Sequence, residues 1–137
     1  MTTSTVVYLG HLHTELKHTK SSEIVLTDAP TDNNGKGEFF SPTDLCATSL
    51  ASCAITTMGI KANSMGIDLG RIEADVYKVM ESNPRRIAAI KIEMRIEGVY
   101  SADEKRSLES AGLYCPVAKS LHPELNQELT FTWLANK

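Results

Sequence analysis

The sequence is poor in aromatic residues and has no cluster of basic residues. Aromatic residues make up 6% of the 137 residues, with a single tryptophan. The formal net charge is -3 at pH 7. Nucleic acids and anionic membranes attract proteins through basic surfaces. The composition therefore predicts neither nucleic acid nor membrane as a partner.

The sequence also has no feature of a targeting or membrane-spanning segment. Its first residues, MTTSTVVYLGHLH, have neither a basic start nor a long apolar run, so we expect no secretory signal. The apolar stretch 46–60 is too short and too rich in serine and threonine to predict a bilayer span. We find no internal repeat, low-complexity segment or linker. Without a signal or span, we expect a cytoplasmic protein. A length of 137 residues predicts a single domain, residues 1–137, with one core.

Cysteine is scarce and odd in number. Three cysteines, Cys46, Cys53 and Cys115, are too few for a disulfide scaffold. In a reducing compartment such a set indicates free thiols, a metal site or redox chemistry.

The stretch from Ser41 to Met65 is the longest apolar segment and predicts a helix. Ser41 suits the N-cap, Pro42 the first helical position, and Asp44 the third residue after the cap. No charged residue occurs between Asp44 and Lys61, and apolar residues lie all round the helix. Such a helix is expected to be buried on every side, with Cys53 in its most enclosed part.

The rest of the chain reads as strands grouped before and after this helix. Residues 5–9, the run after Gly10 and residues 23–26 are strand-like, and residues 28–38 form a loop. After the helix, strands are expected at 72–80, 87–98 and 129–133. In the second of these the alternation predicts one buried face, Ile90, Ile92, Met94 and Ile96. This order of elements predicts an α+β fold with antiparallel sheet.

Two shorter helices are expected between the last two strands. Ser101 and Glu104 form a capping box, and Leu108, Ala111 and Leu113 are the expected inward stripe. Pro116 suits the first position of a further helix, which makes Cys115 its N-cap.

The three cysteines differ in their expected reactivity. A thiol at a helix N-terminus, such as Cys115, is expected to have a lowered pKa. Cys53, in mid-helix, has no such support and requires a nearby cation or hydrogen-bond donor to become reactive. From the residues alone, both thiols could equally be structural, and Cys46 is interpreted as a core residue.

A metal site near the N-terminus is the weaker alternative. His11, His13 and Glu15 would share one strand face, but an exposed polar face is far more common and no second ligand pair completes a set. We therefore expect neither a metal nor a cofactor.

The motif SPTDLCATSLASC, followed by YCPVAKSLHPEL, resembles the OsmC/Ohr family. The family is named for osmotically inducible protein C and organic hydroperoxide resistance protein. Its pattern is a proline and an acidic residue at a helix start, a small-residue helix ending in cysteine, and a later Cys-Pro. The resemblance extends to DAP and NGKGE before the helix and to NPRRI between two strands, and so covers essentially the whole chain.

The resemblance implies an intertwined homodimer whose strands wrap around two central helices. It implies that Cys53 is the peroxidatic cysteine and Cys115 the resolving one. The implied activity is reduction of organic hydroperoxides through a Cys53 sulfenic acid and a Cys53–Cys115 disulfide, in oxidative-stress defence, with reset by an external dithiol.

The sequence departs from the hydroperoxide-reducing members at two positions. Those proteins have a glutamate just after the proline and an arginine in the N-terminal strands. Here Thr43 replaces the glutamate and no arginine precedes Arg71. Asp44 is the candidate for the acidic role, and Lys17, Lys20 or a histidine of the N-terminal strands for the basic one. The alternative function is a redox-quiet protein that binds a hydrophobic small molecule at the dimer interface.

Overall fold

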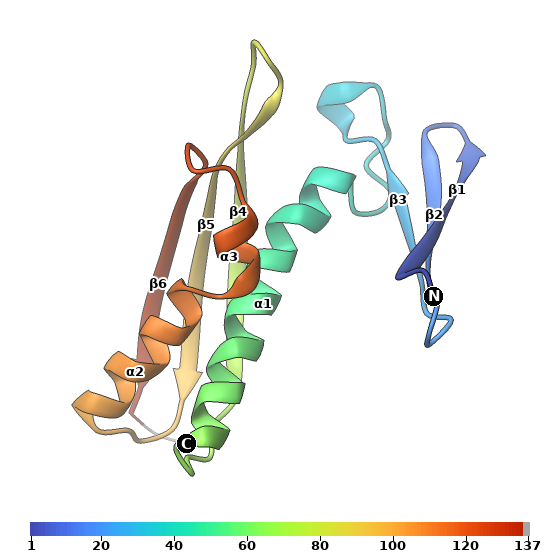
Figure 1. The fold of residues 1–137 in the computed structure, drawn as a ribbon. Helices are drawn as coiled ribbons and strands as arrows, with labels where there is room; N and C mark the ends of the chain where they lie inside the picture. The colour runs from blue at the N-terminus through green and yellow to red at the C-terminus, as the bar shows by residue number, and fades with distance from the viewer. Residues whose placement is uncertain (136–137) are drawn as a thin grey trace. The chain divides into compact units, whose positions relative to one another are not determined.

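Two three-stranded sheets and one long helix form most of the chain in the computed structural model, which describes residues 1–135 (Figure 1). The predicted α+β class is confirmed. The chain divides into two compact units, one of residues 1–46 and one that begins at Ala47. That the two make a single domain stays a prediction.

The first unit is an antiparallel sheet followed by a loop. Its strands, β1 (Ser4–Gly10), β2 (His13–His18) and β3 (Ile24–Asp28), lie in sequence order. The strand-like segments on either side of Gly10 form two separate strands, β1 and β2. His11 and Leu12 form the turn, with φ angles of 54° and 65°. The loop after β3 contains a short 3₁₀ helix, η1 (Thr31–Asn33).

The long helix α1 (Pro42–Ser64) begins where the sequence predicts. Ser41 Oγ accepts a hydrogen bond from the Asp44 N–H at 3.0 Å, and Asp44 Oδ2 accepts one from the Ser41 N–H at 2.9 Å. These two bonds satisfy backbone donors that have no partner inside the helix. The predicted capping arrangement is confirmed.

Burial of α1 is confined to one face. Its buried residues recur at helical spacing and are Ala47, Leu50, Ala51, Ala54, Met58 and Ala62. On the other side Ile60 is 64% exposed. The expectation of burial on every side is therefore wrong for a single chain, because one sheet can cover only one face of a helix.

By length and composition alone, α1 is apolar enough to cross a membrane. It has 23 residues, longer than the 46–60 stretch considered above, and a mean hydropathy of 1.3 in its most apolar window. Core helices of soluble proteins have the same profile, so this feature is weak evidence for a membrane span.

The second unit contains a mixed sheet. Strands β4 (Ile72–Glu81) and β5 (Arg86–Glu97) are antiparallel, as expected, but β6 (Asn126–Leu134) pairs with β5 in parallel. The purely antiparallel expectation fails at this strand. Between β5 and β6 the chain passes through α2 (Ala102–Leu113) and α3 (Pro116–Ser120), and a crossover of this length permits parallel pairing.

The core of the second unit lies between this sheet and the helices on one of its faces (Figure 1). The predicted inward residues of β5 are confirmed, since Ile90, Ile92, Met94 and Ile96 are at most 1% exposed. On α2, Leu108 is buried but Leu113 is 42% exposed, against expectation. Gly112 takes that inward place, because a Cβ there would lie 3.2 Å from Met58 Sδ.

Candidate active site

Cys53 lies in the middle of α1 and is half-buried, so it is less enclosed than the sequence predicts. Its Sγ accepts a hydrogen bond from the backbone N–H of Val117, with an N···S distance of 3.5 Å. Val117 is in the first turn of α3, where N–H groups have no partner within the helix. The hydrogen-bond donor that a reactive Cys53 is expected to require is therefore present, as the backbone N–H of Val117.

Cys115 is the N-cap of α3, with Pro116 at the first helical position, as predicted. It is 0% exposed. Burial raises the pKa of the Cys115 thiol above its ordinary value, and the nearby N–H of Ala118 offsets this only in part. The expectation of a lowered pKa is therefore wrong, because desolvation outweighs the favourable helix N-terminus.

The start of α3 lies beside Cys53, although Cys53 and Cys115 are 115 − 53 = 62 positions apart in sequence. The nearby Cys53 thiol adds to the rise in the pKa of Cys115. A thiol that donates its proton to a neighbouring sulfur, and that faces negative charge on it, stays protonated more easily. The pair thus combines one partly accessible sulfur with one enclosed and protonated sulfur.

Asp44 takes part in the helix start through its hydrogen bonds with Ser41. Its acidic role in catalysis stays a prediction. Lys17, on β2, and Lys20, in the turn after it, have exposed side chains. Their suggested replacement of the family arginine also stays a prediction. Cys46 is half-buried, so its interpretation as a core residue holds only in part.

The suggested metal-ligating face at the N-terminus is not formed. His11 lies in the turn and not on the strand with His13 and Glu15. Instead, His13 faces Asp28 and Glu38 within the first unit. Sequence reasoning missed these two carboxylates, because they belong to a segment interpreted only as a loop. The available signal was the pair of motifs DAP and NGKGE, which contain Asp28 and Glu38.

The sequence model for OsmC-like proteins matches residues 35–130. The chain belongs to the OsmC family. The resemblance stated from the motifs is thereby confirmed, and proteins of this family are soluble. None of the curated proteins matches the chain.

Solved structures of the OsmC family have the same fold. A candidate osmotic stress induced and detoxification response protein of Psychrobacter arcticus is 46% identical, with a TM-score of 0.91 over 96% of each chain. The organic hydroperoxide resistance protein OsmC of Legionella pneumophila is 16% identical, with a TM-score of 0.76 over 96% of this chain and 98% of that one. An organic hydroperoxide resistance protein of Elizabethkingia anophelis is also 16% identical, with a TM-score of 0.69 over 98% of each chain. At such low identity the last two are similar in fold alone.

Proposed function

We propose that this OsmC-family chain is a thiol-dependent peroxidase that reduces organic hydroperoxides in oxidative-stress defence. The observation that carries the proposal is the hydrogen bond from the N–H of Val117, two residues after Cys115, to Cys53 Sγ at 3.5 Å, which brings the Cys-Pro segment to Cys53. The hydroperoxide resistance proteins of Legionella pneumophila and Elizabethkingia anophelis share the fold, which supports the same class of chemistry.

The proposed reaction has two thiol steps. The Cys53 thiolate attacks the terminal oxygen of the hydroperoxide, the O–O bond breaks, and an alkoxide leaves and takes up a proton to become the alcohol. Cys53 is thereby oxidised to a sulfenic acid. The Cys115 sulfur then attacks the Cys53 sulfur, water leaves, and a Cys53–Cys115 disulfide forms. An external dithiol returns both residues to thiols by disulfide exchange.

The environments of the two sulfurs favour this division of roles. Cys53 is partly exposed and receives the Val117 N–H, so peroxide can reach a sulfur whose thiolate has a donor. Cys115 is enclosed, and burial keeps its pKa raised, so it is protected from direct oxidation. The hydrogen bond from the Val117 N–H to Cys53 Sγ supports a resolving role for Cys115, which lies two residues before Val117.

The substrate class follows from the surroundings of the thiols. Both cysteines belong to or pack against the hydrophobic core of the second unit, with Val117 and Ala118 beside them. An apolar setting favours the organic part of an alkyl or aryl hydroperoxide over hydrogen peroxide.

A second copy of the chain is the proposed partner. The four consecutive residues Val6, Val7, Tyr8 and Leu9 of β1 are each more than half exposed. Successive strand residues point to opposite faces, so both faces of this strand expose apolar side chains to water. Ile60 on α1 adds a further exposed apolar side chain. A homodimer would cover them, and light scattering should give twice the chain mass of 15.0 kDa, whereas a folded monomer would contradict it.

The function is tested by adding cumene hydroperoxide to the reduced protein and counting free thiols. We expect two thiols per chain to be lost and to return on treatment with a dithiol. Retention of all three thiols in a folded protein would exclude the peroxidase and favour the alternative, a redox-quiet protein that binds a hydrophobic small molecule.

A further inference from the structure

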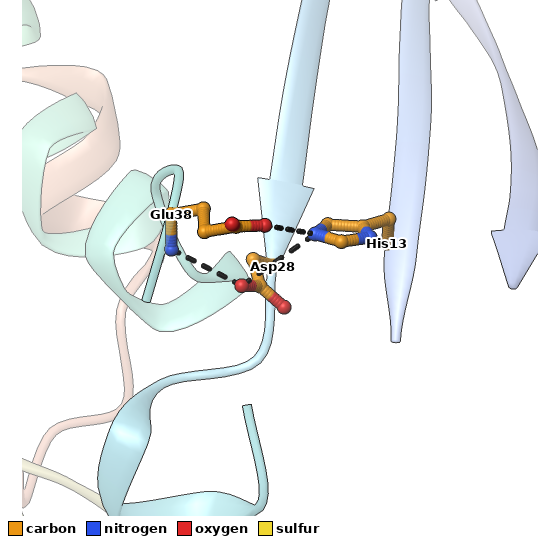
Figure 2. A group of neighbouring side chains, drawn as sticks. All are labelled: His13, Asp28 and Glu38. Carbon is orange, nitrogen blue, oxygen red and sulfur yellow. Dashed lines mark hydrogen bonds and ion pairs between the residues drawn. The ribbon is translucent and has the colours of Figure 1, made fainter. Parts of the chain in front are cut away.

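Three side chains that can bind a metal converge in the first unit (Figure 2). His13 on β2 and Asp28 at the end of β3 are direct partners in the antiparallel register. Side chains at such paired positions lie on the same face of a sheet, close to each other. Glu38 comes from the loop after β3 and points toward the same place. Its carboxylate, that of Asp28 and the His13 ring offer ligand atoms within 4.8 Å of one another.

The loop that carries Glu38 is closed at its base. The Asp28 N–H donates to the Phe40 carbonyl at 3.0 Å, and the Gly37 N–H donates to the Ala29 carbonyl at 3.2 Å. Gly35 has no room for a side chain, because a Cβ there would lie 1.7 Å from the Ala29 oxygen. The backbone just before Glu38 is therefore fixed against the end of β3.

Asp28 is a buried anion at the centre of this cluster. Its side chain is 1% exposed, and Oδ2 accepts hydrogen bonds from the N–H groups of Glu38 at 3.1 Å and Lys36 at 3.3 Å. A buried carboxylate of this kind requires a cation nearby.

His13 Nε2 faces both carboxylates without a hydrogen bond. It lies 3.5 Å from Asp28 Oδ2 and 3.2 Å from Glu38 Oε1. Nε2 is inaccessible to solvent and has no hydrogen-bond partner among residues 1–135. Phe39 packs edge-on against the ring, with centroids 5.6 Å apart. The ring is thus held with one nitrogen directed at two anionic oxygens.

These distances fit a shared metal ion better than an ion pair of protonated histidine. A charged N–H donor usually lies about 2.7 to 2.9 Å from a carboxylate oxygen and forms a hydrogen bond. Ligand atoms bonded at about 2.0 to 2.1 Å to a tetrahedral zinc lie about 3.3 Å from one another. The separations of 3.2 and 3.5 Å between His13 Nε2 and the two carboxylate oxygens are close to that value, and all the ligand atoms lie within 4.8 Å of one another.

We propose that His13, Asp28 and Glu38 form a binding site for a divalent first-row transition metal such as Zn²⁺. One imidazole and two carboxylates suit such an ion, whereas Mg²⁺ and Ca²⁺ prefer oxygen ligands throughout. Three protein ligands leave a fourth position for water. A surface hollow of about 480 Å³ lies beside His13 and is lined by His11, Leu12, His13, Asn34, Gly35 and Lys36.

The test is calorimetric titration of Zn²⁺ into the full-length reduced protein. The decisive variant is Glu38→Gln, because this side chain is 52% exposed and its replacement does not disturb the core. Glu23→Gln is the matched control, an exposed glutamate of the same unit outside the cluster. We expect one saturable site in the wild type and in Glu23→Gln, with the Kd raised at least about tenfold in Glu38→Gln. Equal affinity in all three proteins, or no saturable binding, would overturn the proposal.

Anomalous diffraction at the zinc edge tests the proposal without any variant. Crystals grown with Zn²⁺ should give a peak between the three side chains. A peak only at the Cys53 and Cys115 thiols would contradict the site, because zinc would then be bound by sulfur.

Discussion

Cys115 and Asp28 are almost equally buried, at 0% and 1% exposed, yet their pKa values shift in opposite directions. At Cys115 burial is the largest effect and raises the pKa, so the thiol keeps its proton. At Asp28 the Glu38 N–H is the largest effect and lowers the pKa, so the carboxylate stays charged. Burial alone therefore does not decide whether an acid ionises; the donors and charges around it do.

The opposite pKa shifts of Cys115 and Asp28 distinguish a thiol site from a cation site. Cys53 lies in α1 and Cys115 at the start of α3, both in apolar surroundings. There Cys115 stays protonated until Cys53 is oxidised to a sulfenic acid. The cluster of His13, Asp28 and Glu38 lies on a strand pair and a loop rich in backbone donors. Its fixed negative charge suits a cation.

The largest effect is expected when the reactive thiol, Cys53, is removed. In Cys53→Ser we expect peroxide consumption to fall to the uncatalysed rate, with the fold kept, because α1 already carries Ser49 and Ser52. Cys46→Ser on the same helix is the control and should consume peroxide like the wild type. Cumene hydroperoxide turnover and circular dichroism measure both effects, and undiminished turnover in Cys53→Ser would contradict the assignment.

Removing the buried thiol should stop the reaction one step later. We expect Cys115→Ser to reduce about one equivalent of hydroperoxide per chain and then to stall as a Cys53 sulfenic acid. Excess peroxide should oxidise that sulfur further, to sulfinic acid. Trapping with dimedone and intact-mass measurement follow both products. Continued turnover with a dithiol and no trapped adduct would exclude Cys115 as the resolving residue.

The raised pKa of Cys115 should make the free energy of unfolding depend on pH. Above its ordinary pKa of 9.0 the unfolded chain loses this proton while the folded protein retains it. The folded state then binds more protons, so the free energy of unfolding falls as the pH rises above about 9. Urea unfolding of reduced wild type at increasing pH should show this decrease, and Cys115→Ser should lack that part of it. Parallel pH profiles for the two proteins would contradict burial as the cause.

The smallest expected effect is at the start of α1. Asp44→Ala should lower the free energy of unfolding by about 1 kcal/mol if Asp44 acts only in the helix cap. Ser41→Ala, which removes the other half of the same pair of hydrogen bonds, is the control. A loss of peroxide reduction in Asp44→Ala alone, beyond its change in stability, would give Asp44 the acidic role of the family.

Local sequence signals predicted most of the elements. Ser41 with Asp44 and Ser101 with Glu104 predicted helix starts that the structure contains, since capping depends on neighbouring residues only. The alternation that ends at Ile96 predicted the buried face of β5. The parallel pairing of β6 was missed, because the path of a crossover is not encoded in the strand itself.

A residue of a candidate site was predictable from the sequence only where a local motif contains it. Cys53 and Cys115 were found from their motifs, but the direction of the pKa shift at Cys115 depends on what covers it. Glu38 was missed because its place beside His13 results from loop closure onto Asp28. Long-range packing decides both features, and it leaves no periodic pattern in the sequence.

The central claim is that Cys53 and Cys115 exchange an oxidised sulfur. Mass spectrometry of proteolytic peptides after one equivalent of cumene hydroperoxide tests it most directly. We expect a Cys53–Cys115 disulfide as the main product, with Cys46 still a free thiol. A linkage through Cys46, or no linkage between Cys53 and Cys115 within one chain, would contradict the claim.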